Sequence, residues 1–283
     1  MTRAERIRAL GLLAPAYLWL TVAVFLPLSA MAFFSLLTEV PFGEREWSFT
    51  IANYTEVFGN PVYATLLWKS LKLGFWVTFW CLVLGFPCAW ILARMLKGRS
   101  REVLFLLVIL PFWSNALVRI FSWAIVLRGN GVLDRAVNAV LPWDVNINLM
   151  FSEPAIIIGL VHSYLPYVIL TTYLSLQAID ETLIEAARSL GARWPRILWR
   201  LVLPLALPGL IAGAVLVFVP VVGSFMEPRL LGGRFGTTYG TLIEDQFVAV
   251  FNWPLGAALS FILLAVVLVI LAAASPALRK AAT

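Results

Sequence analysis

Six long apolar segments dominate this 283-residue sequence. Each is roughly 20–27 residues long, and about 20 apolar residues are enough for a helix to cross the hydrocarbon core of a bilayer. Spanning segments of this kind are helical because a helix satisfies its backbone hydrogen-bonding groups internally. The sequence therefore predicts an all-α integral membrane protein with six transmembrane helices in one domain, residues 1–283. The segments run near residues 11–37, 71–95, 103–127, 155–177, 203–226 and 255–278.

Composition supports this class. Hydrophobic residues make up 61% of the chain and charged residues 13%. Soluble domains contain about 45–50% apolar and about 25% charged residues, and disordered chains are rich in charge. A water-soluble domain and a disordered protein are therefore excluded. The first apolar segment exceeds the roughly 7–15 apolar residues of a secretory signal peptide, so we expect it to be a retained membrane helix.

Basic residues gather in alternate connections between the segments. Lys and Arg are enriched in the cytoplasmic loops of membrane proteins. Both termini, and the connections after the second and fourth segments, are therefore predicted to be cytoplasmic. The basic residues on this side are Arg3, Arg6, Arg8, Arg94, Lys97, Arg99, Arg101, Arg188, Arg193, Arg196, Arg200, Arg279 and Lys280. This asymmetry explains the net charge of +6 without a nucleic-acid partner.

The connection between the fourth and fifth segments has the pattern of a helix, a sharp turn and a second helix. Asp180 or Thr182 can cap the first helix, and Thr182 with Glu185 has the spacing of a capping box. Gly191 suits the left-handed residue that ends a helix, and Pro195 suits the first turn of the next one. We expect an amphipathic helix ending at Gly191 and a second helix that leads into the membrane.

Residues 185–204 of this connection resemble the motif E-A-A-x3-G-x9-[IV]-x-L-P, which marks membrane subunits of binding-protein-dependent ABC importers. The motif residues are Glu185, Ala186, Ala187, Gly191, Leu203 and Pro204, with Leu201 in the Ile/Val place. The resemblance implies that the loop at residues 178–202 carries a coupling helix, including Arg188, that docks on a separate ATPase. A capping role alone is the alternative for Glu185. The chain has no G-x-x-x-x-G-K-[ST] loop, so the resemblance implies that ATP and Mg²⁺ are bound by that ATPase and that this chain carries no cofactor.

Other stretches are similar to the permeases of polyamine importers, most of all to the first permease subunit of spermidine/putrescine transporters. They are residues 110–114, 118–123, 219–233, 240–247 and 252–258. The resemblance implies a type I ABC importer permease in the bacterial inner membrane that forms half of the pathway for a small cationic solute. Its implied partners are a second related permease, two copies of the ATPase and an extracytoplasmic solute-binding protein. Ser224 stands where putrescine relatives often place an acid, so an amino acid derivative, an opine-like compound, sulfate or iron remains an alternative solute.

Ionisable and aromatic residues near the segments are candidates for the pathway. Arg119 lies inside the third segment, where an arginine costs about 2.5–3.5 kcal/mol and should face a wet cavity or a partner. We expect either an ion pair at an outer gate or snorkelling to the outer surface. The possible partners are Glu227, Glu244 and Asp245. Aromatic faces attract ammonium groups, although ordinary packing also explains such rings, which are Trp113, Trp123, Tyr164 and Tyr167. The gate or pathway candidates are thus Trp113, Arg119, Glu227 and Asp245.

Two other function classes fit poorly. An ion-coupled secondary transporter predicts paired acids inside the membrane, which the six segments nearly lack. An intramembrane enzyme needs a constellation such as H-E-x-x-H, and the single histidine, His162, belongs to none. We therefore expect no catalytic residue and no metal ligands on this chain. His162 is expected to line the pore or to make a hydrogen-bonded helix contact.

Overall fold

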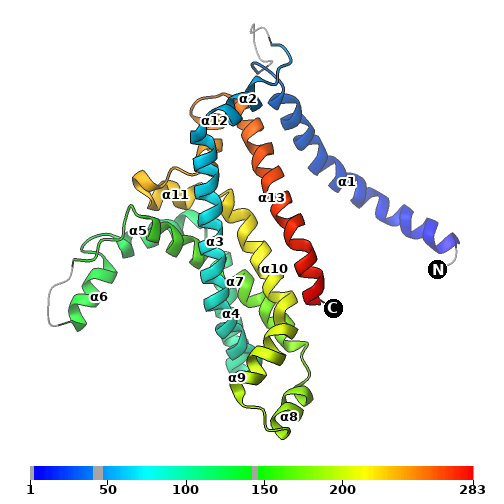
Figure 1. Ribbon diagram of the computed structural model, residues 1–283, viewed down its shortest axis with the longest axis vertical. Helices are drawn as coiled ribbons and strands as arrows, with labels where there is room; N and C mark the ends of the chain where they lie inside the picture. The colour runs from blue at the N-terminus through cyan, green and yellow to red at the C-terminus, as the bar shows by residue number, and fades with distance from the viewer. Residues whose placement is uncertain (1–2, 41–46, 142–145, 283) are drawn as a thin grey trace. The chain divides into compact units, whose positions relative to one another are not determined.

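A computed structural model describes the backbone of residues 3–40, 47–141 and 146–282, with side chains between residues 12 and 274 of these ranges (Figure 1). The described residues are helical apart from loops and one isolated bridge between Leu37 and Phe49. Within them, six stretches are long and apolar enough to cross a membrane, which confirms the predicted all-α membrane class. They are Leu12–Ser35, Pro61–Met95, Ala116–Val140, Glu153–Gln177, Trp194–Val222 and Trp253–Ala274.

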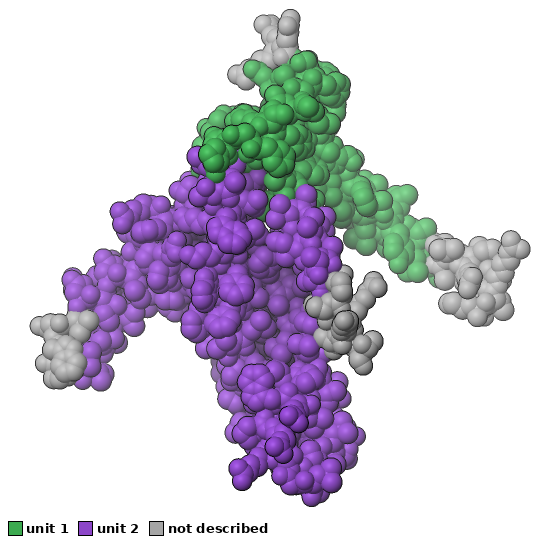
Figure 2. Space-filling model, in the orientation of Figure 1, with its two compact units in different colours: residues 1–61, 243–264 green, residues 62–242, 265–283 purple. Residues whose placement is uncertain are grey.

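The chain divides into two compact units (Figure 2). Unit 1 comprises residues 1–61 and 243–264, and unit 2 comprises residues 62–242 and 265–283. The two units differ in size, and the single membrane domain expected over residues 1–283 stays a prediction. Three helices have residues in both units: α12 (Tyr239–Val248), α13 (Trp253–Ala282) and α3 (Pro61–Trp90), of which only the first residue, Pro61, is assigned to unit 1.

Unit 1 contains α1 (Arg3–Ser35) and α2 (Ala52–Gly59). Asn53 ties them together, because its side-chain amide donates to the carbonyl oxygens of Ser35 at 3.1 Å and Leu37 at 2.9 Å. The apolar side chains of α1 are largely exposed, Trp19 among them. Such an apolar surface fits hydrocarbon rather than water.

Unit 2 contains most of the helices, and its core is shared by α3, α7 and α10. The fully buried residues Val77, Leu160 and Val217 come from these three helices. The elements of unit 2 from α3 to α7 are α3 (Pro61–Trp90), η1 (Ile91–Met95), α4 (Arg99–Ile109), η2 (Leu110–Trp113), α5 (Ala116–Leu127), α6 (Val132–Val140) and α7 (Glu153–Gln177). Those that follow are α8 (Glu181–Ser189), α9 (Trp194–Ile197), η3 (Leu198–Val202), α10 (Leu203–Val222), α11 (Met226–Leu231) and η4 (Gly233–Phe235).

Helices α7 and α10 approach each other closely at two glycines of α10. A Cβ atom on Gly209 would lie 2.5 Å from the carbonyl oxygen of Thr171, and one on Gly213 would lie 2.7 Å from the Thr171 hydroxyl. Small residues allow such backbone contact between membrane helices, where packing replaces the hydrophobic effect as the cause of association. The pair α7–α10 is therefore a tightly packed centre of unit 2.

The third predicted segment, residues 103–127, is not one helix. Helix α4 ends at Ile109, a 3₁₀ turn follows, and α5 begins after Asn115, whose side chain accepts a hydrogen bond from the Leu117 N–H at 2.8 Å. Pro111 causes the break because it has no N–H and its ring clashes with the preceding turn. The apolar stretch of membrane length in this region is Ala116–Val140, which includes α6.

The second and fifth segments begin earlier than predicted, and each contains a π-helical turn. Helix α3 begins at Pro61 and continues through η1, and the fifth segment begins at Trp194 and continues through η3 into α10. Pro204 cannot donate to a carbonyl one turn before it, and the preceding turn is widened, with the Leu203 N–H bonded to the Leu198 carbonyl. Helix α10 then ends at Val222, before the predicted residue 226. The remaining three segments begin and end within several residues of the prediction.

Candidate functional site

The connection between α7 and α10 forms the predicted helix, which is α8. Asp180 is its N-cap, and the Asp180 carboxylate accepts a hydrogen bond from the Thr182 N–H at 2.9 Å. This bond, with a further one from the Thr182 side chain, holds the pKa of Asp180 below its usual value. Of the two predicted caps, Asp180 is therefore the right one. Thr182 lies inside the helix, so the predicted Thr182–Glu185 capping box is wrong.

Helix α8 ends at the predicted glycine. Gly191 has a φ of 76°, a left-handed conformation that costs other residues energy. The Gly191 N–H bonds to the Arg188 carbonyl at 2.9 Å, and the Ala192 N–H bonds to the Ala187 carbonyl at 3.0 Å. This is the hydrogen-bond pattern of a Schellman motif. Pro195 lies in the first turn of α9, as predicted, so the sharp turn between α8 and α9 follows from local sequence.

Helix α8 presents one face to solvent and packs the other on unit 2. Ile184 is buried in a cluster with Leu176 of α7 and Ile197 of α9. Glu185, Ala186 and Arg188 are exposed, as is Gly191, whereas Ala187 is half-buried. The exposed face is extended by Leu183 and Leu190, the latter 88% exposed. Leu203 is half-buried and Pro204 exposed at the start of α10.

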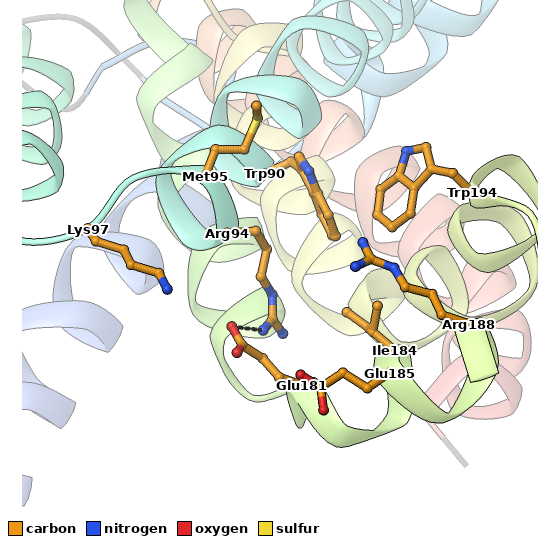
Figure 3. A pocket seen from close by; sticks show the side chains of 9 residues that line it. All are labelled: Trp90, Arg94, Met95, Lys97, Glu181, Ile184, Glu185, Arg188 and Trp194. Atoms are coloured by element: carbon orange, nitrogen blue, oxygen red, sulfur yellow. Dashed lines mark hydrogen bonds and ion pairs between the residues drawn. The ribbon is translucent and has the colours of Figure 1, made fainter.

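A pocket of about 480 Å³ lies between the end of α3 and the α8–α9 turn (Figure 3). The Arg94 guanidinium donates to Glu181 at 3.2 Å and to the carbonyl oxygens of Leu176 at 2.7 Å and Ile179 at 2.5 Å. Those two carbonyls lie at the end of α7 and in the link to α8. Arg94 of η1 therefore joins this segment to the end of α7 and to α8. The sequence did not reveal this role beyond the place of Arg94 among the basic residues predicted to be cytoplasmic.

Aromatic contacts close the other side of this pocket. The Trp90 and Trp194 rings lie 5.2 Å apart, and the Arg188 guanidinium lies 5.8 Å from the centre of the Trp194 ring (Figure 3). These contacts join α3, α8 and α9.

A second cavity, of about 320 Å³, lies in unit 2 near the middle of α7. Glu227 at the start of α11 is 7% exposed there. Its carboxylate accepts hydrogen bonds from the Ser224 hydroxyl at 2.9 Å and the Ser163 hydroxyl at 3.3 Å. The full lining is Phe112, Ala116, Arg119, Ser163, Tyr164, Tyr167, Pro220, Gly223, Ser224, Phe225, Met226 and Glu227.

Of the four predicted pathway residues, Arg119 and Glu227 line this cavity together. Arg119 does not form the expected carboxylate pair with any described residue; its Nη1 donates to the Pro111 carbonyl oxygen at 2.6 Å, which satisfies a group freed by the helix break. Trp113 is 88% exposed and lies outside the lining, where Phe112 stands instead. Asp245 lies in α12, in the part assigned to unit 1.

His162 and the four aromatic candidates do not all lie at the cavity. The His162 ring packs edge-on against Trp123 at 5.6 Å, and its buried Nδ1 has no hydrogen-bond partner in the described part of the chain. The expected helix contact is present, but the expected hydrogen bond at Nδ1 is not. Tyr164 and Tyr167 line the cavity and stack with ring centres 6.0 Å apart. Tertiary packing thus separates Trp123 from the cavity.

The described residues thus form a multi-pass helical membrane protein with an exposed short helix, α8, and a polar cavity. The sequence profile of the binding-protein-dependent transport system inner membrane components matches residues 85–278, and the chain belongs to this family. It is a permease subunit of an ABC importer and resides in the inner membrane.

Individual relatives agree with this assignment. The chain is 40% identical over 249 residues to the spermidine/putrescine transport system permease protein PotB of Escherichia coli (strain K12), covering 87% of this chain and 88% of the relative. The same protein of Haemophilus influenzae is 37% identical over 242 residues, covering 86% and 84%. A permease from a bacterial transporter that imports the acidic polysaccharide alginate has the same fold, with a TM-score of 0.72, 17% identity and 98% of each chain covered.

Proposed function

We propose that this chain is the permease of an ATP-driven importer of polyamines such as putrescine or spermidine. The observation that carries the proposal is the 40% identity to PotB over nearly the whole of both chains. The cavity supports it, because a buried carboxylate beside aromatic rings suits an ammonium group. The fold alone does not identify the solute, because a structure with the same fold belongs to an importer of an acidic polysaccharide.

The complete importer, in this proposal, pairs the chain with a second related permease, two copies of an ATPase and an extracytoplasmic binding protein. ATP and Mg²⁺ bind to the ATPase and not to this chain, and both termini are cytoplasmic. The exposed face of α8 supports an ATPase contact, and the basic residues of the predicted inner loops support the orientation. A permease of the same fold is part of an alginate transporter solved with its ligand-bound periplasmic protein.

The geometry indicates how ATP-driven movement reaches the cavity. Closure of the ATPases displaces α8, which is tied to α3 and α7 through Arg94 and Ile184. Helices α7 and α10 then move together because of their close packing at Gly209 and Gly213. Ser163 lies on α7 and Gly223 follows α10, so this movement changes the walls of the cavity. Permeation requires alternation of access and no covalent chemistry on this chain.

Uptake by cells that lack their own polyamine importers tests the proposal. The chain is expressed with its co-encoded partners, and uptake of labelled putrescine, spermidine, an amino acid and sulfate is measured. We expect polyamine uptake, strongly reduced by Gly191→Val, with the variant chain still inserted in the membrane. Uptake of the amino acid or sulfate instead would overturn the polyamine assignment and leave the importer assignment intact.

A further inference from the structure

Glu227 is a buried carboxylate without a cationic partner among the described residues. Its two oxygens accept hydrogen bonds from Ser163 and Ser224. A carboxylate has about four lone-pair sites, so two hydroxyls leave acceptor capacity that faces the cavity. A buried carboxylate without a direct ion pair is destabilising. The site is therefore favourable to a mobile cation that can pair directly with Glu227.

The walls beside Glu227 are shaped for an organic cation. Tyr164 and Tyr167 stack on one another, and Phe112 packs against Tyr167 with ring centres 4.7 Å apart. Aromatic faces stabilise an ammonium group and also contact a methylene chain. A cavity of about 320 Å³ has room for a flexible aliphatic amine.

Arg119 adds a positive charge to the same cavity. Its guanidinium is held at the α4–α5 break by the Pro111 carbonyl, and it forms no ion pair with Glu227. A pathway site must bind its solute weakly enough to release it. Arg119 provides this weakening for a cation, because it repels the ammonium group that Glu227 attracts.

We propose that Glu227, with Ser163, Ser224 and the Tyr164–Tyr167 wall, forms a transient seat for one primary ammonium group of the solute as it crosses the permease. Arg119 limits the time that this group remains bound. The inference rests on the proposed polyamine function and deepens it. It assigns to this permease a cation-selective step of its own, in addition to selection by the binding protein.

The test uses the complete importer in proteoliposomes with saturating putrescine-loaded binding protein. Putrescine uptake and ATP hydrolysis are measured together. We expect Glu227→Gln to lower putrescine transported per ATP by about tenfold, which corresponds to ~1.4 kcal/mol. Glu227→Asp should keep most of the transport because it keeps the charge. Glu102→Gln, an exposed acid on α4, is the matched control and should behave as the wild type.

Arg119→Gln removes the positive charge and keeps an N–H donor for Pro111. Because the repulsion is then lost, the ammonium group should stay longer at Glu227, and we expect transport per ATP to fall by less than in Glu227→Gln. A fall as large as that of Glu227→Gln would mean that the solute needs both charges, as a zwitterion does, and would overturn the proposal. Tyr167→Ala should also lower transport while Tyr167→Phe retains it, which tests the same seat if Glu227→Gln fails to assemble with the ATPase.

The two proposals fail in distinguishable ways. If the wild-type importer takes up no polyamine, the proposed function is wrong. If it takes up putrescine and Glu227→Gln transports as much per ATP as the wild type, the ammonium seat is wrong and the polyamine function stands.

Discussion

At the residue scale, Gly191 has the clearest backbone requirement in the coupling segment. No atom lies within 4 Å of the position that a Cβ atom would take, so its surroundings leave room for a side chain. The requirement comes from its φ of 76°. A non-glycine residue in this conformation is destabilised by about 1–2 kcal/mol, and asparagine is destabilised least.

Comparison of Gly191→Val with Gly191→Asn therefore distinguishes two requirements at this position. One is the positive φ of the backbone, and the other is the absence of a side chain at the ATPase contact. We expect Gly191→Val to reduce uptake strongly and Gly191→Asn to retain most of it, at equal amounts of chain in the membrane. Equal loss in the two variants would contradict the conformational account, and would indicate that any side chain here blocks the ATPase contact.

At the element scale, Arg94 joins α3 to the end of α7 and the start of α8. Hydrogen bonds from a charged donor contribute about 1.5–3 kcal/mol each. We expect Arg94→Ala to leave the chain inserted and to lower uptake per ATP hydrolysed, because α8 then moves without α3. Lys97→Ala is the control, since Lys97 lines the same pocket and is exposed (Figure 3). Similar losses for the two variants would argue against a specific clamp.

The contact between α7 and α10 makes a second prediction at this scale. Gly209→Ala puts a methyl group against the Thr171 carbonyl, and overpacking of this kind costs about 1–3 kcal/mol. Thermal unfolding in detergent should show a clear fall in melting temperature. Gly59→Ala, where nothing lies within 4 Å of the added carbon, should unfold near the wild-type temperature. An unchanged melting temperature for Gly209→Ala would mean that the two helices separate at little cost.

At the scale of the whole molecule, the exposed faces of α1 and α8 require different surroundings. Helix α1 is apolar from Leu12 to Ser35, and this part suits lipid or another membrane helix. Helix α8 has a charged and small-residue face, which suits a soluble protein surface. Purification of the tagged chain in mild detergent should therefore recover an ATPase and a second permease, identified by mass spectrometry. Recovery of the chain alone, in a stable form, would contradict the proposed assembly.

Turns and helix ends in this chain are largely predictable from the sequence, whereas contacts between distant segments are not. The turn at Gly191 and the start of α9 at Pro195 depend on residues within one or two turns of helix. They were predicted correctly because backbone conformation and capping are local. The choice between Asp180 and Thr182 as the cap was also local, but both residue types satisfy the same rule, so only the structure separated them.

Sequence by itself determined the membrane class, the approximate position of five of the six spans and the turn from α8 to α9. Apolar length and local capping suffice for these, because a helix in lipid must satisfy its own backbone. Tertiary structure alone decided the break near Pro111, the clamp at Arg94 and the meeting of Glu227 with Ser163. These depend on which side chains from distant segments face one another. No periodicity or spacing along the chain encodes that packing.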